Sequence, residues 1–176
     1  MPPSSRTFGL DMTDEPAVVV IGAGIAGLLA AGRLAAAGHR VVVLEKALTP
    51  GGRVATQLLS GARFDTGAQF FTVRSKEFSA LADEWLASGV TFEWCRGFDQ
   101  PPAQPDGYPR YAARGGMVAL AENLAAGLDV RYASAVTAIG PDGKVTLDDN
   151  SAIENKAVVL TPPAPQSLAL LDAGGT

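Results

Sequence analysis

The sequence predicts an α/β fold that opens with a strand, a helix and a second strand. The first observation is an uninterrupted apolar run at residues 17–21, typical of a strand buried on both faces of a parallel sheet. The second is a G-x-G-x-x-G pattern that follows it at residues 22–27. The third is a helix-favouring stretch, residues 25–37, followed by another apolar run at residues 41–44. This order predicts a Rossmann-like βαβ unit that binds a dinucleotide.

The glycines of this unit have separate predicted roles. Gly22 allows a tight turn, Gly24 lets the backbone approach a pyrophosphate, and Gly27 lets the helix pack closely on the strand. Gly38 supplies the left-handed residue that ends the helix. We expect the pyrophosphate on the first helical turn, where unpaired N–H groups and the helix dipole favour negative charge.

An acidic residue and an arginine follow the second apolar run. Glu45 comes 18 positions after Gly27, about where a carboxylate accepts hydrogen bonds from an adenosine ribose, and its charge would repel a 2′-phosphate. After the Gly51-Gly52 turn, Arg53 either is a solvated surface cation or returns to the bound pyrophosphate or flavin. A simple nicotinamide dehydrogenase does not need this element, so its presence favours a flavin.

Composition limits the classes of function. The chain has 176 residues, 47% of them hydrophobic, enough for one core and part of a second domain. The net charge of −4 and the lack of any Lys/Arg cluster argue against a nucleic-acid partner. Glycines interrupt the apolar runs well before they could span a bilayer, so no membrane partner is expected. We expect a small-molecule substrate; the oligomeric state is left open.

The rare reactive side chains exclude several kinds of chemistry. Cys95 is the single cysteine, which excludes an intramolecular disulfide and a cysteine-cluster metal site and fits a reducing cytoplasm. His39 is the single histidine and falls in a turn, so HExxH zinc sites and Ser-His-Asp triads are excluded. No metal site and no particular catalytic side chain are predicted. A cofactor is therefore expected to carry the chemistry.

The middle of the chain alternates between short elements. The segment 64–72 has small residues at its centre, which indicates either a close backbone approach to a ligand at Gly67-Ala68 or a bulged strand. Ser75 is a predicted N-cap of a helix that ends at Gly89 and buries an aromatic stripe. A strand is predicted at residues 90–94. The Pro/Gly-rich residues 98–108 are the predicted internal boundary.

The last third predicts strands around one more helix. The expected elements are a short strand at 111–113, a helix at 117–126, strands at 130–139 and 145–147 joined by a turn at 141–144, and a buried strand at 157–161. The acidic residues 148–150 are interpreted as a hairpin turn rather than a metal site. From Pro162 to Thr176 we expect only a proline loop, an apolar turn and a frayed end.

Four segments, in this order, resemble the flavin-containing amine oxidase superfamily and most closely its renalase-like branch. They are VVVIGAGIAGLLAA with PGGRVAT, then FDTGAQFFTVRS, RYAARGGMVALAENLA and VVLTPPAPQSLALL. The resemblance implies a Rossmann-like FAD-binding domain with part of an inserted α+β substrate domain. It implies FAD contacts at Gly22, Ala23, Gly24, Ile25, Ala26, Gly27, Glu45, Lys46, Gly52, Arg53, Gly67, Ala68, Gln69, Phe70 and Val136.

The resemblance also implies a division of the chain and an activity. Residues 1–15 would be a disordered tail, 16–75 the FAD-binding unit with the flavin-side segment, 76–118 a partial substrate domain, and 119–176 the return to the FAD-binding domain. The implied function is an FAD-dependent oxidoreductase that oxidises a dihydronicotinamide-type or amine substrate by hydride transfer to FAD, with oxygen as acceptor. The alternatives are an NAD-dependent dehydrogenase or an inactive dinucleotide-binding remnant. Because members of this family continue beyond this length, the chain is expected to be a fragment, a truncated product or a minimal binder.

Overall fold

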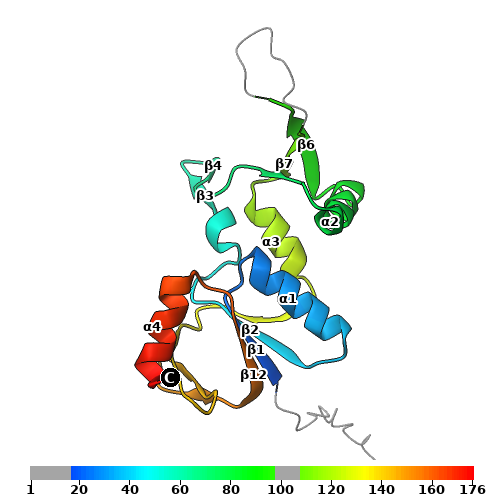
Figure 1. Cartoon of the computed structure of the whole chain (residues 1–176). Helices are drawn as coiled ribbons and strands as arrows, with labels where there is room; N and C mark the ends of the chain where they lie inside the picture. The colour runs from blue at the N-terminus through cyan, green and yellow to red at the C-terminus, as the bar shows by residue number, and fades with distance from the viewer. Residues whose placement is uncertain (1–16, 98–107) are drawn as a thin grey trace, which may run out of the picture.

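A computed structural model describes residues 17–97 and 108–176. A four-stranded parallel sheet lies at its centre in the order β12-β1-β2-β8 (Figure 1). Its strands are β12 (Asn155–Leu160), β1 (Ala17–Ile21), β2 (Val41–Leu44) and β8 (Asp129–Arg131). The predicted strand-helix-strand opening is confirmed: α1 (Ile25–Ala36) joins β1 to β2, and the two strands pair in parallel. The expected mixed α/β, Rossmann-like class is therefore correct.

The alternate residues of β1 and β2 serve two cores. On one face, Val20 and Val43 pack with α1 and α3 (Val118–Ala125). On the other face, Val19 and Val42 pack with α4 (Ala164–Gly174) and with a three-stranded antiparallel sheet. Figure 1 shows α1 and α3 on one side of the parallel sheet and α4 on the other. That second sheet has the order β11-β10-β9, with β9 (Val136–Ile139), β10 (Val145–Leu147) and β11 (Ala152–Ile153).

Three expectations for the last third are wrong. The predicted strand at 130–139 is two strands: β8 joins the parallel sheet, and β9 begins the antiparallel one. The strand predicted as buried at 157–161 corresponds to β12, which lies at the sheet edge and is half-exposed along most of its length. The expected loop after Pro162 contains α4 instead, because Pro165 is tolerated in a first helical turn and Gly175 ends the helix in a left-handed conformation.

A hairpin and a third antiparallel sheet complete the fold. The hairpin β3 (Thr56–Leu59) and β4 (Ala62–Asp65) was not expected from the sequence, although the Ser60-Gly61 turn marks it with two positive φ angles. The sheet β5-β7-β6 carries α2 on one face. Its elements are β5 (Phe71–Thr72), β7 (Arg110–Ala113), β6 (Thr91–Cys95) and α2 (Lys76–Ala87).

The helix predicted after Ser75 is confirmed in detail. The Ser75 hydroxyl oxygen accepts a hydrogen bond from the N–H of Phe78 at 3.2 Å, and Gly89 follows the helix with φ of 75°. The predicted aromatic stripe is part of the core: the Phe78 and Trp85 rings pack edge to face, 5.8 Å apart. Both belong to the core that also contains α1 and α3.

Two expectations concern residues outside the described part of the chain. These are the N-terminal tail at 1–15 and the boundary loop at 98–108, of which only Tyr108 is described. The predicted domain boundaries remain predictions. Within residues 17–97 and 108–176, no helix is long and apolar enough to cross a bilayer.

Candidate cofactor site

The glycine-rich loop between β1 and α1 leaves no room for side chains at two positions. Gly22 has φ of +101°, which an L-residue rarely adopts. A Cβ on Gly27 would lie 2.0 Å from the carbonyl oxygen of Gly22 and 2.8 Å from the Thr161 hydroxyl. Thr161 donates from that hydroxyl to the carbonyl of Ile21 at 2.7 Å and so ties β12 to the loop. The roles predicted for Gly22 and Gly27 therefore have a direct steric basis.

The first turn of α1 is open to an anion. The N–H of Leu28 makes the first intrahelical hydrogen bond, to the carbonyl of Gly24 at 2.9 Å, so the amides of residues 25–27 precede the helical ladder. Gly24 is the N-cap, no side chain caps the helix, and its first turn contains no acidic residue. A Cβ on Gly24 would meet nothing within 4 Å. This is the arrangement that phosphate groups occupy at helix N-termini.

Glu45 connects the end of β2 to this loop. The residue is buried, with 8% of its surface exposed. One carboxylate oxygen accepts the N–H of Ala23 at 2.7 Å, and the other accepts the N–H of Ala47 at 2.9 Å. Each oxygen retains a second lone pair, so the carboxylate still has acceptor capacity for the predicted contact to a ribose. In this structure the carboxylate positions the glycine loop.

The Gly-Gly-Arg segment lies against the same loop. The N–H of Gly51 donates to the carbonyl of Ala23 at 2.9 Å, and Gly51 forms a parallel bridge with Gly24. Gly52 begins a short 3₁₀ helix, η1 (Gly52–Val54), in which Arg53 is exposed. Within the described residues, the Arg53 guanidinium has no hydrogen-bond or ion-pair partner. The backbone contacts of Gly51 therefore bring the segment that carries this exposed cation to the glycine loop before α1.

The small residues after β4 pack against this segment. A Cβ on Gly67 would lie 2.0 Å from the carbonyl oxygen of Arg53, and the N–H of Ala68 donates to that oxygen at 2.8 Å. Residues 66–70 form bends rather than a strand. The backbone at Gly67-Ala68 thus packs closely against the chain's own η1, and the expected approach to a ligand there stays a prediction.

The remaining predicted positions extend the site in two directions. Lys46 is exposed beside Glu45, and the carbonyl of Glu45 accepts the N–H of Ser134 at 2.9 Å, which brings the start of β9 and Val136 to this end. At the opposite end, Gln69 is exposed and Phe70 packs against the Trp94 ring, 6.0 Å between centroids. The structure therefore brings residues 22–27, 45 and 51–53 together, with Gly67-Ala68 behind Arg53. The cofactor contacts themselves stay predictions.

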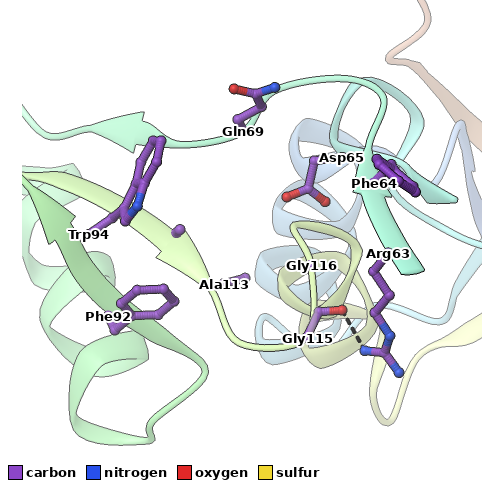
Figure 2. A pocket seen from close by; sticks show the side chains of 10 residues that line it. Arg63, Phe64, Asp65, Gln69, Phe92, Trp94, Ala113, Gly115 and Gly116 are labelled. Atoms are coloured by element: carbon purple, nitrogen blue, oxygen red, sulfur yellow. Dashed lines mark hydrogen bonds between the residues drawn. The ribbon is translucent and has the colours of Figure 1, made fainter. Parts of the chain in front are cut away.

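A hollow of about 500 Å³ lies beyond Gln69, between the β3–β4 hairpin and the β5-β7-β6 sheet (Figure 2). Ten of the described residues line the hollow: Arg63, Phe64, Asp65, Gln69, Phe92, Trp94, Ala112, Ala113, Gly115 and Gly116. Only Gln69 among them was predicted as a site residue. The others come from β4, β6, β7 and the turn before α3, which lie far apart in the sequence, so no local motif identifies them as a group. Their size and polarity suit a small organic ligand.

Two further residues escaped the sequence reasoning. Thr161 donates a hydrogen bond to the residue before the glycine loop. In the sequence it could have been recognised by its place between a strand and the Pro162-Pro163 pair. Tyr132 lies near Glu45: burial, together with the carboxylates of Glu122 and Glu45, raises the pKa of its phenol. The phenol therefore stays protonated at this end of the site. Within the described residues, no three His, Cys, Asp or Glu side chains are grouped to hold a metal ion.

Asp65 caps α3 from outside the helix. Its carboxylate accepts the N–H of Met117 at 2.8 Å and the hydroxyl of Thr56, and the Thr56 oxygen accepts the N–H of Val118 at 3.1 Å. Met117 and Val118 begin the helix, and no side chain of the helix itself accepts a hydrogen bond from these first N–H groups. The hairpin is thereby attached to the helix that packs on α1.

Asp65→Ala is therefore expected to lower the free energy of unfolding by about 1–2 kcal/mol, the usual cost of losing an N-cap acceptor. Urea unfolding followed by far-ultraviolet circular dichroism measures it. Asp148→Ala is the matched control, since that exposed carboxylate has no hydrogen-bond partner in the described part of the chain. Equal midpoints for the two variants would show that the cap does not stabilise the fold.

The fold and the loop geometry define a dinucleotide-binding α/β protein, and comparisons with known proteins narrow this class. Residues 20–85 match the NAD(P)-binding Rossmann-like domain, and residues 78–172 match the flavin containing amine oxidoreductases. The chain belongs to the flavin containing amine oxidoreductase family. The description of this family agrees with the expected class, an FAD-dependent oxidoreductase, and with the expected flavin cofactor.

Two curated relatives illustrate the range of the family. Putrescine oxidase of Kocuria rosea is 44% identical over 79 residues, which is 45% of this chain and 16% of that protein. A neurosporene-forming phytoene desaturase of Cereibacter sphaeroides is 41% identical over 81 residues, 46% of this chain and 15% of the relative. The aligned segments thus span about a sixth of these proteins.

Solved structures share the fold over more of the chain. Putrescine oxidase bound to putrescine superposes with a TM-score of 0.65 at 18% identity, over 85% of this chain and 58% of that one. A fatty acid isomerase from P. acnes gives a TM-score of 0.67 at 16% identity, over 90% of this chain and 61% of that one. At such identities the likeness shows the fold alone. The renalase-like branch is not among these relatives.

Proposed function

We propose that the protein is an FAD-dependent oxidoreductase of renalase type, which oxidises a dihydronicotinamide-type or amine substrate with oxygen as the final acceptor. Membership of the flavin containing amine oxidoreductase family supports the cofactor. The FDTGAQFFTVRS segment supports the finer assignment by its resemblance to the renalase-like branch. In the structure this segment begins in β4, packs against η1 at Gly67 and lines the hollow at Gln69.

The observation that carries the proposal is the pairing of an open helix N-terminus with an uncompensated arginine. The amides of residues 25–27 and the Arg53 guanidinium offer hydrogen-bond donors and positive charge, as the diphosphate of FAD requires. At the other end Glu45 retains lone pairs for ribose hydroxyls. The residues present therefore fit the adenosine diphosphate half of the cofactor.

When bound, the flavin would supply the two-electron acceptor that this chain's side chains lack. The chain's own residues then have two tasks. The glycine loop and Arg53 hold the diphosphate in place, while the hollow beside Gln69 holds the substrate ring in a fixed orientation. Among the residues that the structure describes, Asp65 is the single carboxylate that lines the hollow, and its oxygen already caps α3. Hydride transfer mainly requires that the substrate be correctly oriented toward the flavin, which agrees with these two tasks.

Arg53→Ala is expected to weaken FAD binding about tenfold or more, because a charge-assisted contact to a phosphate contributes roughly 1.5–3 kcal/mol. Titration of the cofactor-free protein with FAD, followed by quenching of flavin fluorescence, measures it. The matched control is Arg33→Ala, which removes an exposed arginine in the last turn of α1, away from the loop.

Three results would change the proposal. An unmutated protein that takes up NAD but no FAD would support the dehydrogenase alternative. Tight FAD binding without peroxide production from any dihydronicotinamide or amine would support the inactive remnant. Equal FAD affinity of Arg53→Ala and Arg33→Ala would remove Arg53 from the site.

A further inference from the structure

The Asp65 carboxylate uses only one of its two oxygens within the fold. Oδ1 accepts both the N–H of Met117, at 2.8 Å, and the hydroxyl of Thr56. Among residues 17–97 and 108–176, Oδ2 has no hydrogen-bond partner, and no lysine or arginine lies at ion-pair distance from it. Asp65 is half-buried, and solvent reaches Oδ2. This oxygen is therefore an accessible acceptor with its lone pairs unused.

The cap of α3 holds this carboxylate in one orientation. Met117, whose N–H it accepts, is 1% exposed at the start of the helix. The Thr56 hydroxyl donates to Oδ1 and accepts the N–H of Val118 at 3.1 Å, so both of its hydrogen-bonding functions are used. A Cβ on Gly116 would lie 2.6 Å from the Thr56 hydroxyl oxygen, so the turn before the helix packs tightly on this side chain. The plane of the Asp65 carboxylate is thereby fixed, with one oxygen directed away from the cap.

The residue with the free oxygen lines the hollow. Figure 2 shows Asp65 on the hairpin side, across from Phe92 and Trp94 on the β5-β7-β6 sheet. Arg63, the single described cation that lines the hollow, donates from Nη1 to the carbonyl of Gly115 at 2.6 Å and not to the carboxylate. The hollow thus combines aromatic walls on the sheet side with one fixed acceptor on the hairpin side. Such a polar group in an otherwise mostly apolar site determines how a ligand is oriented.

We propose that Asp65 contacts the substrate: Oδ1 caps α3, and Oδ2 accepts a hydrogen bond from an N–H group of the molecule bound in the hollow. The inference rests on the proposed function and adds a residue to it, since both substrate types considered there carry N–H groups. An acceptor that its cap already fixes loses little rotamer entropy when it binds the substrate. A substrate carboxylate at the same place would instead meet a like charge. Asp65 selects and orients the substrate, and it takes no part in the transfer of hydride.

Four probes of nearly equal shape test the inference: benzamide, benzamidine, acetophenone and benzoate. Benzamide carries a neutral N–H donor and benzamidine a cationic one, whereas acetophenone and benzoate carry none. Their dissociation constants are measured calorimetrically on the full chain saturated with FAD. We expect the better of benzamide and benzamidine to bind about tenfold or more tighter than acetophenone, and benzoate to bind no tighter than acetophenone. The probe that binds better shows whether the preferred donor is an amide or a cation.

Asp65→Asn separates the substrate contact from the helix cap. The N–H of Met117 and the hydroxyl of Thr56 both require an acceptor, so the amide oxygen must face the cap and the NH₂ group must face the hollow. We expect the urea midpoint and the FAD affinity to stay close to those of the unmutated protein, while the preference over acetophenone is lost. Asp65→Ala should lose both the cap and the preference. Asp148→Asn, the matched surface control, should change neither.

Acetophenone binding as tightly as the better N–H probe would overturn the inference. So would an Asp65→Asn variant that folds and keeps the full preference, because the free oxygen would then not be the acceptor. If Asp65→Asn does not fold, the comparison of acetophenone with benzamide and benzamidine in the unmutated protein decides. A chain that binds no FAD refutes the proposed function separately, and titration of the cofactor-free chain with the same probes then still tests the role of Asp65.

Discussion

Gly27→Ala is expected to lower the free energy of unfolding by about 3 kcal/mol or more and to abolish FAD binding. The added Cβ would lie 2.0 Å from the carbonyl oxygen of Gly22 and 2.8 Å from the Thr161 hydroxyl. The first neighbour is backbone at the end of a buried strand, and the second is held by its hydrogen bond to Ile21. Neither can move without displacing α1 from the parallel sheet.

The same helix provides the control for this prediction. A Cβ on Gly32 would meet no heavy atom within 4 Å. Gly32→Ala should therefore raise the free energy of unfolding by about 0.5–1 kcal/mol, the difference in helix propensity between the two residues. Urea unfolding and FAD titration measure both variants. Similar midpoints for Gly27→Ala and Gly32→Ala would mean that the close contact seen at Gly27 is not a constraint.

Glu45→Gln is expected to lower the free energy of unfolding by about 1–3 kcal/mol, because a buried carboxylate loses one of two charge-assisted acceptors. An amide has one acceptor oxygen, so either the N–H of Ala23 or that of Ala47 would face an NH₂ group. The glycine loop would loosen, and FAD affinity should fall with stability. Glu45→Arg, which would test discrimination against a 2′-phosphate, also removes both acceptors and would disturb the same loop.

The control is a substitution that removes a carboxylate charge from the surface and breaks no hydrogen bond. Glu154→Gln alters a surface carboxylate that has no hydrogen-bond partner in the described part of the chain. Its urea midpoint and FAD affinity should match those of the unmutated protein. If Glu45→Gln also matches them, the carboxylate neither positions the loop nor contributes to the site.

Local physics explains what could be predicted from the sequence. Buried parallel strands read as continuous apolar runs, and the glycines between them meet steric demands that only glycine satisfies, as at Gly22 and Gly27. The cap at Ser75 is likewise a contact between neighbours in the chain. The hairpin β3–β4 and helix α4 were missed because their local signals are weak. Leu58 and Phe64 are exposed, so no alternation of apolar and polar residues marks the hairpin.

The sequence by itself thus determined the Rossmann-like unit, the glycine loop and the likeness to a flavin-dependent family. Only the tertiary structure decided how Asp65 is used, since the helix that it caps begins 52 positions later. Only the register between β6 and β7 places Phe92 opposite Ala112 and so beside Arg114. Such contacts depend on strand pairing and on packing across the chain, and neither is encoded in the pattern of any single segment.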